Sequence, residues 1–172
     1  MSPFISIIIP FYGTADPVLL QRCLDSIRRQ GMEEGSYEII VVDDNGKGLG
    51  GARNQGIRQA TGTYLMFVDA DDYLFPNLSY CFPYLLKYTP DVCSFQMCEV
   101  NRPGVIPQSF NYKWEVYESG AEYMSKNNFM GTAWRHFFSR SFLNIHGLAF
   151  AESCFHEDED FVAKAYCLAS TT

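Results

Sequence analysis

Two acidic clusters follow apolar runs in the first half of the chain, and their positions indicate a cation site. The run at 39–42 ends in Asp43 and Asp44, and the run at 64–68 ends in Asp-Ala-Asp-Asp at 69–72. Short β-branched and aromatic runs bounded by turn residues are typical of buried strands. Charges at the carboxyl ends of parallel strands lie in the crevice where open α/β sheets bind ligands. Carboxylates gathered there need a cation between them, so the pattern predicts a divalent metal that carries a nucleotide diphosphate.

Asp69 and Asp71 are the candidate metal ligands. Alternate side chains of an extended segment share one face. The two carboxylates can therefore bind one Mg²⁺ or Mn²⁺, whose remaining positions go to phosphates and water. The alternative is a polar turn with a helix cap, because Asp is common in both. The buried strand before Asp69 and the further acid Asp72 favour the metal site.

Glycines at 46, 48 and 51 have the spacing of the dinucleotide fingerprint, which makes a nicotinamide oxidoreductase a competing hypothesis. However, residues 43–45 separate the strand from the first glycine, whereas the fingerprint has its tight turn at the strand end. A pyrophosphate bound at these glycines would also face two carboxylates. In addition, a ribose hydroxyl needs only one acidic partner, whereas the segment 69–72 contains three acids. Glycines 46, 48, 50 and 51 instead let the backbone pass close to a ligand and let a helix begin near Ala52.

Two further charged groups each have a functional and a structural interpretation. Arg53, in the first turn of that helix, could bind a phosphate or ribose bidentately, or it could pair with a nearby aspartate. The cluster His-Glu-Asp-Glu-Asp at 156–160 opens the last predicted helix. Acids at a helix N-terminus are favoured by the macrodipole, which is the structural interpretation. Four acids in succession exceed what a cap requires, and one of them could act as general base on an incoming hydroxyl.

The predicted elements alternate between strands and helices in the first half of the chain. We expect a strand at 4–10, a helix opened by Asp16 and Pro17 that reaches Gly31, a strand at 37–42, a helix at 51–60 and a strand at 64–68. Such alternation implies right-handed crossovers and a parallel sheet. Past Asp72 we expect a helix at 76–88, a strand at 91–100, a hairpin or ordered loop at 101–119, a helix near 121–127, an aromatic segment at 134–142 and a helix from Glu157.

Composition and charge exclude several classes of protein. Of the 172 residues, 47% are hydrophobic and 16% aromatic, which excludes disorder and fits one domain with its own core. The net charge of -7 argues against binding to nucleic acid, and it means that a metal is needed to bridge the protein to a negative nucleotide-sugar. The sequence has no basic leader, no apolar stretch long enough to span a bilayer and no Cys-x-x-Cys pair among its six cysteines. We therefore expect a soluble cytoplasmic protein with reduced thiols.

Taken together, the motifs resemble the family 2 inverting glycosyltransferases with the GT-A fold, over nearly the whole chain. The segments that carry the resemblance are the opening strand at 6–12, the nucleotide-side strand at 40–44, the helix Gly-Ala-Arg-Asn-Gln-Gly at 51–56, the acidic motif at 69–72, and two acceptor-side segments at 134–140 and 156–161. The resemblance implies an α/β fold of the Rossmann-like, nucleotide-diphospho-sugar transferase type, in which helices sandwich a central, mostly parallel sheet.

The resemblance also assigns the donor-side residues. Asp44 would accept a hydrogen bond from the base N–H of a uridine-type nucleotide, and Pro10 and Tyr12 would line the same pocket. Asp69 would lie near the ribose. Asp71 would hold the metal, Mn²⁺ or Mg²⁺, on the diphosphate.

On the acceptor side, Asp158 matches the family's catalytic base. It would deprotonate an acceptor hydroxyl for in-line attack on the anomeric carbon, which inverts the configuration of that carbon. The implied activity is metal-dependent transfer of a sugar from a nucleotide-diphosphate donor, a UDP-sugar, to a glycan or lipid-linked acceptor in polysaccharide or cell-envelope synthesis. The alternative is a sugar-nucleotide binding module without catalysis.

The resemblance carries three further expectations. We expect one catalytic domain at 1–172, with a nucleotide-sugar binding half at 1–100 and an acceptor-side half at 101–172. Because family members generally continue with helices that close the acceptor site, we expect the acceptor-side half to be truncated at its C-terminus. We expect the full-length protein to be cytoplasmic, with peripheral association at the inner face of the cell membrane.

Overall fold

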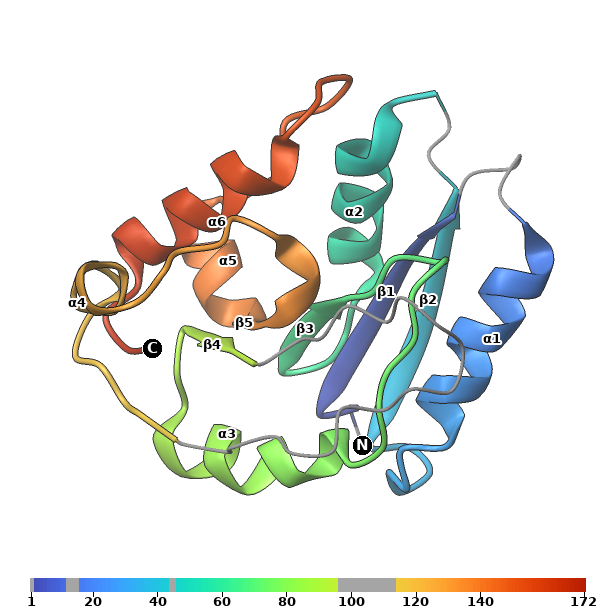
Figure 1. The fold of residues 1–172 in the computed structure, drawn as a ribbon, viewed down its shortest axis with the longest axis horizontal. Helices are drawn as coiled ribbons and strands as arrows, with labels where there is room; N and C mark the ends of the chain where they lie inside the picture. Colours follow the sequence, from blue (N-terminus) through green and yellow to red (C-terminus); the bar gives the residue numbers. More distant parts are fainter. Residues whose placement is uncertain (1, 12–15, 44–45, 96–113) are drawn as a thin grey trace.

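The computed structural model describes residues 2–11, 16–43, 46–95 and 114–172, which form one five-stranded sheet with helices on both faces (Figure 1). The elements in chain order are β1 (Ile5–Phe11), α1 (Pro17–Arg28), β2 (Tyr37–Asp43), α2 (Gly48–Gln59), β3 (Tyr64–Phe67), the 3₁₀ helix η1 (Leu78–Cys81), α3 (Phe82–Tyr88), β4 (Val92–Ser94), α4 (Gly120–Lys126), the 3₁₀ helix η2 (Ala133–Arg135), β5 (His136–Ser139), α5 (Arg140–His146) and α6 (Glu157–Leu168).

The strand order in the sheet is β2-β1-β3-β5-β4. β1 lies between β2 and β3 and pairs with both in parallel, as the alternation of strands and helices predicts. β5 runs antiparallel to β3 on one side and to β4 on the other. The α/β class is thus confirmed. The antiparallel strand β5 lies in a stretch that was predicted only as an aromatic segment.

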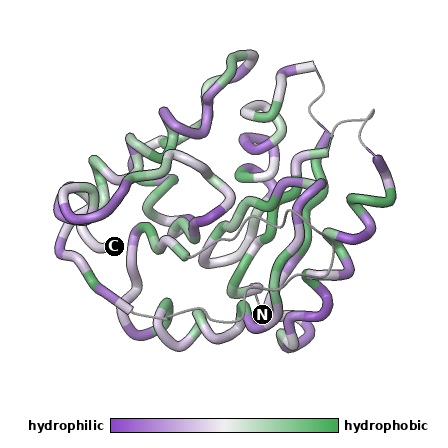
Figure 2. The backbone as a smooth tube through the Cα atoms, viewed as in Figure 1, coloured by the Kyte–Doolittle hydropathy of each residue, from purple (hydrophilic) through white to green (hydrophobic). Residues whose placement is uncertain are grey.

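Two apolar cores lie on opposite faces of the sheet, and β1 contributes to both because successive side chains of a strand alternate. Ile8 packs in the core that α2, α5 and α6 cover, whereas Ile7 and Ile9 pack in the core that α1 and α3 cover. Figure 2 shows hydrophobic residues concentrated along the strands. Because both faces are covered, the strands are near-continuous apolar runs in the sequence.

Helix α1 begins as its capping residues predict. The Asp16 carboxylate accepts a hydrogen bond from Val18 N at 2.8 Å, and Pro17 occupies the first helical position. The helix ends at Arg28, before the predicted stop at Gly31, whose backbone is left-handed with φ +66°.

A hydrogen-bond network joins the amino-terminal ends of β1, β2 and β3. Glu38 Oε1 accepts from Ser6 Oγ at 2.6 Å and from Thr61 N at 2.7 Å, and Ser6 Oγ accepts from Gly62 N at 2.8 Å. Burial opposes ionisation of Glu38, but these hydrogen bonds favour its charged form and hold the pKa of the carboxyl below its ordinary value. The network links the starts of β1 and β2 to the residues just before β3, at the end of the sheet opposite the predicted site.

Other boundaries differ from the expectations for local reasons. Asn77 is left-handed, with φ 86°, so the helix predicted at 76–88 becomes η1 followed by α3. Helix α2 begins at Gly48, earlier than predicted. Residues 96–113, which hold the rest of the strand predicted at 91–100 and most of the following loop, lie outside the described residues. No helix in the described ranges is long and apolar enough to cross a bilayer.

Candidate active site

Strands β1, β2 and β3 end at one edge of the sheet, and predicted donor-side residues lie there. Pro10, buried near the end of β1, is in register with Val42 of β2. Beyond the end of β3, Val68 N donates to Ile8 O at 3.0 Å. Asp69 follows directly, so it lies beside the end of β1. The structure therefore brings Pro10 and Asp69 to the same edge, where an open α/β sheet binds its ligand.

Two predicted nucleoside contacts, Tyr12 and Asp44, lie outside the described residues, and their roles stay predictions. Each directly follows a described residue at this edge. Those preceding residues, Phe11 and Asp43, are register partners at the ends of β1 and β2.

The turn after β3 gathers three carboxylates. Asp72 N donates to Asp69 O at 3.0 Å, which closes the turn. Asp69 is half-buried, whereas Asp71 and Asp72 are exposed. Desolvation of its carboxyl, and next the repulsion from Asp69 and Asp71, raise the pKa of Asp72 above its ordinary value. A cation would relieve this repulsion, so the donor set fits a divalent metal that prefers oxygen ligands.

The protein groups do not by themselves complete a metal site. Among the described residues, no group of three or more His, Cys, Asp or Glu side chains is placed to hold an ion. Mg²⁺ is commonly bound through one or two carboxylates together with substrate phosphates and water. This is the arrangement predicted for Asp69 and Asp71, and it stays a prediction.

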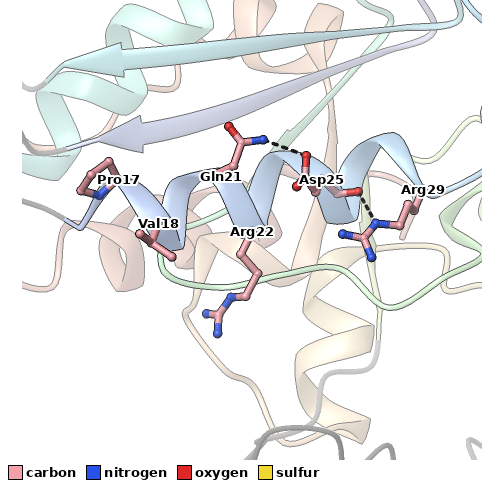
Figure 3. A pocket seen from close by; sticks show the side chains of 6 residues that line it. All are labelled: Pro17, Val18, Gln21, Arg22, Asp25 and Arg29. Carbon is pink, nitrogen blue, oxygen red and sulfur yellow. Dashed lines mark hydrogen bonds between the residues drawn. The ribbon is translucent and has the colours of Figure 1, made fainter.

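Arg22 of α1 contacts the acidic turn that follows β3. Its Nη2 donates to Asp71 O, and its guanidinium carbon lies 5.0 Å from the centroid of the Tyr73 ring. Figure 3 shows Arg22 projecting from α1 beside an open hollow along that helix, whose other lining residues are Pro17, Val18, Gln21, Asp25 and Arg29. None of the predicted site residues lines this hollow, so we do not identify it with the donor site.

Arg53 of α2 is the buried cation of the candidate site. Its side chain is 2% exposed, with Nη2 3.0 Å from Asp69 Oδ1 and Nη1 2.8 Å from Glu157 Oε1. The Glu157 side chain, at the start of α6, is 7% exposed. The structure thus shows the predicted pairing of Arg53 with a nearby aspartate. The predicted bidentate bond to a phosphate or ribose stays a prediction, since both terminal nitrogens here bond to carboxylates.

Aromatic rings surround this buried arginine. The guanidinium carbon lies 5.4 Å from the centroid of the Phe150 ring. Phe150 in turn stacks on Phe161 of α6 at 3.8 Å and meets Phe67 of β3 edge-on at 5.1 Å. In such an environment of low polarity, the ionic hydrogen bonds of Arg53 are stronger than they would be in water.

The segment between α5 and α6 is hydrogen-bonded to α2 and to the residue that precedes it. Asn54 Nδ2 donates to Phe150 O at 2.9 Å, and Phe150 N donates to Asn54 Oδ1 at 2.8 Å. Ser153 N donates to Lys47 O at 2.9 Å. These bonds set the position from which α6 starts.

Gly50 permits this close contact. A Cβ atom at that position would lie 2.1 Å from Ala151 O, a backbone atom. The glycine-rich stretch was predicted to let a ligand approach the backbone. At Gly50 the near neighbour is instead the protein's own chain, which corrects that interpretation for this residue.

The acids at the start of α6 occupy different environments. Glu157 is buried against Arg53, Asp158 is half-buried, and Glu159 and Asp160 are exposed. Asp158 Oδ1 accepts a hydrogen bond from Glu159 N at 3.1 Å. The macrodipole accounts for acids in a first turn, but not for a buried one that pairs with an arginine from another helix. Because Glu157 shares Arg53 with Asp69, the start of α6 and the acidic turn after β3 are adjacent. The role of Asp158 as general base stays a prediction.

Sequence reasoning did not single out Glu157 or Asn54. The signal in the sequence is that Arg53 lies one helical turn before Gly56, so the two residues share a helix face. The structure shows that this face is buried, because a Cβ at Gly56 would lie 2.2 Å from Ile8 Cγ2 of β1. An arginine on the buried face of a helix requires buried counter-charges. What the sequence does not tell is which of the many acids supply them.

Comparisons with known proteins match most of the chain to one family. The family model described as Glycosyl transferase family 2 matches residues 6–47 and 45–144. The chain is 37% identical over 97 aligned positions, which cover 41% of its length, to a poly(ribitol-phosphate) beta-glucosyltransferase of Bacillus spizizenii, of which it covers 15%. It is 29% identical over 204 aligned positions, 96% of its length, to the uncharacterized glycosyltransferase EpsJ of Bacillus subtilis, of which it covers 57%. The chain thus spans about half the length, or less, of these curated relatives.

Solved structures share the fold. The crystal structure of S. aureus TarS 1-349 in complex with UDP-GlcNAc superposes with a TM-score of 0.79 at 24% identity, over 98% of this chain and 54% of that one. The complex of the same protein with UDP gives a TM-score of 0.76 at 23% identity, over 98% and 56% of the two chains.

Proposed function

This chain belongs to glycosyl transferase family 2, and from that premise we propose that it transfers a sugar from a UDP-sugar to a glycan or lipid-linked acceptor of the cell envelope. The transfer inverts the anomeric configuration of the sugar and uses Mn²⁺ or Mg²⁺. The observation that carries the proposal is that Pro10, Asp69 and the start of α6 lie at the carboxyl edge of a GT-A type sheet, with Asp71 in the turn that Asp69 opens.

The donor and the pathway are proposed from the relatives. TarS has been crystallised with UDP and with UDP-GlcNAc, which supports a uridine nucleotide-sugar as donor. The name of the Bacillus spizizenii relative supports an acceptor of the cell-envelope polymer type. We further propose that the full-length protein works in the cytoplasm at the inner face of the membrane, and that residues 1–100 form the donor half and residues 101–172 the acceptor half of one domain.

The donor-side residues would bind and orient the nucleotide. Asp44 accepts from the uracil N–H, Pro10 and Tyr12 line the base pocket, and Asp69 lies near the ribose. Asp71, with Asp69, would hold the metal, which when bound offsets the charge of the diphosphate.

Asp158 would remove the proton from the acceptor hydroxyl. The acceptor oxygen then forms a bond to the anomeric carbon on the face opposite the diphosphate, and the bond from that carbon to the diphosphate oxygen breaks. The proton stays on Asp158, the electron pair leaves with UDP, and the configuration at carbon is inverted.

Calorimetric titration with UDP, with and without Mn²⁺, tests the proposal. We expect binding that is at least tenfold tighter with Mn²⁺ than with EDTA, because the protein and the ligand are both negative. CDP is the matched control, since it differs from UDP only in the base that Asp44 would read. Equal binding with and without metal would remove the metal from the proposal, and no UDP binding in either condition would refute the donor assignment.

A further inference from the structure

Arg53 holds two carboxylates that come from opposite sides of the candidate site. Asp69 lies in the acidic turn after β3 on the donor side, and Glu157 lies at the start of α6 on the acceptor side. We propose that Glu157 and Arg53 are positioning residues, which control how much of the Asp69 carboxylate is free to meet a nucleotide–metal complex. The inference rests on the proposed donor site at Asp69.

The geometry leaves Asp69 only partly engaged. Arg53 Nη2 bonds to Oδ1 of Asp69, whose side chain is 28% exposed, so part of this carboxylate faces solvent. The other terminal nitrogen of Arg53 lies 2.8 Å from Oε1 of the buried Glu157 side chain. The guanidinium is therefore divided between two acids, and it does not cover both oxygens of Asp69.

The third nitrogen of the Arg53 guanidinium, Nε, is available for a different pairing if Glu157 is removed. Arg53 Nε is buried and has no hydrogen-bond partner in the part of the chain that the structure describes. An arginine pairs most strongly with a carboxylate when two parallel N–H groups meet both oxygens. Without the charge of Glu157, Arg53 gains by turning Nε and one terminal nitrogen toward Asp69. Both Asp69 oxygens would then be occupied by protein, and the nucleotide–metal complex would lose a ligand.

The acceptor side thereby influences the donor side. Glu157 directly precedes Asp158, the proposed base, so any shift in the first turn of α6 alters the bond that keeps Asp69 free. The aromatic surroundings of Arg53 strengthen this dependence, because charge interactions grow where water is excluded. Donor affinity should consequently depend on a residue that belongs to the acceptor-side helix.

The test compares two variants of one helix turn by calorimetric titration with UDP and Mn²⁺. Glu157→Gln removes the charge that draws Arg53 away from Asp69. Asp160→Asn is the matched control, since it removes one negative charge from the same helix turn. Asp160 pairs with Lys164 and not with Arg53, and 46% of its side chain is exposed. We expect Glu157→Gln to weaken UDP–Mn²⁺ binding by about fivefold or more, whereas Asp160→Asn binds as the wild type does. Equal affinities for the two variants would overturn the inference.

Arg53→Lys gives a second variant in case Glu157→Gln does not fold. An ammonium group keeps the charge but cannot bridge two carboxylates with planar geometry. We expect the same loss of UDP–Mn²⁺ affinity, and wild-type affinity in this variant would also overturn the inference.

A double-mutant cycle in urea unfolding separates this inference from the proposed function. We measure the unfolding equilibrium constant for Asp69→Asn, Glu157→Gln and the double variant. The effect of the double variant should differ from the combined effects of the two single variants by more than about twofold, because both residues act on Arg53. Additive effects would overturn the inference. If the wild type does not bind UDP at all, the proposed function falls, and the cycle alone decides whether Arg53 couples the two sides.

Discussion

We predict that Gly50→Ala disrupts the attachment of the segment before α6. A Cβ at this position would lie 2.1 Å from Ala151 O, and ordinary contacts begin near 3.4 Å. The two backbones must therefore separate by roughly 1.3 Å, the difference between these distances. Neither side can yield by rotating a side chain, because the clash involves a backbone oxygen.

The magnitude follows from three contributions. Alanine favours the helix over glycine by about 1 kcal/mol, which opposes the effect. Overpacking costs about 1–3 kcal/mol. The separation also strains the two hydrogen bonds between Asn54 and Phe150, each worth about 1 kcal/mol. We therefore expect Gly50→Ala to lower the free energy of unfolding by roughly 2–4 kcal/mol.

Urea unfolding followed by tryptophan fluorescence measures this change. Gln59→Ala, at the exposed end of the same helix, is the control and should stay within about 0.5 kcal/mol of the wild type. Adding Asn54→Ala to Gly50→Ala should cost less than Asn54→Ala alone, since the bonds are already strained. A Gly50→Ala variant as stable as the wild type would refute the close packing of α2 on the segment before α6.

Three further predictions address the metal, the base and a buried histidine. Asp71→Asn should reduce UDP affinity with Mn²⁺ to its metal-free level, because an amide does not neutralise a cation. Its unfolding free energy should stay within about 0.5 kcal/mol of the wild type, and a titration with retained Mn²⁺ dependence would contradict the assignment. Asp158→Asn in the full-length protein should lower turnover by roughly 10²–10⁴-fold with unchanged UDP affinity. If Asp158 only caps the helix, the variant should keep its turnover, since Asn caps nearly as well as Asp. Burial, and next the charge of Arg135, lower the pKa of His136 to about 3, so below pH about 6.5 the unfolded chain takes up a proton that the folded protein refuses. Stability should therefore fall between pH 6.5 and 5 with an added slope of up to about 1.4 kcal/mol per pH unit, and a His136→Phe variant with the same slope as the wild type would contradict this.

The sequence predicts the fold of the segment up to β3 well because each of its signals is local. The run at 64–68 is apolar without alternation and its residues are buried, which is typical of a strand covered on both faces. The run at 39–42 is apolar as well, although β2 lies at the edge of the sheet and Val41 is exposed. Asp16 and Pro17 mark the start of α1 by capping chemistry that involves only neighbouring residues. The acids that follow the strands then come to one edge, because parallel strands end on the same side.

The features that were missed depend on contacts distant in the sequence. The segment at 136–139 is aromatic enough for a strand, but its place between β3 and β4 follows from pairing with strands distant in the sequence and from no local pattern. Glu157 is one acid in a row of four, and only the approach of Arg53 distinguishes it from the exposed Glu159. Gly50 could be recognised as a site of close approach, but not which chain segment approaches.

The position of β5 has a consequence for how the chain reaches its native state during synthesis. One edge of β3 pairs with residues that emerge from the ribosome long after it, since Tyr64 is in register with Ser139. Until then, that edge presents unpaired backbone groups on a strongly apolar strand, and β4, within the described strands, pairs only with the same late segment. Exposed strand edges of this kind promote intermolecular pairing, and late, distant contacts slow folding. A nascent or proteolysed fragment that ends before residue 136 should therefore aggregate or require a chaperone, even though it contains every residue proposed for the donor side.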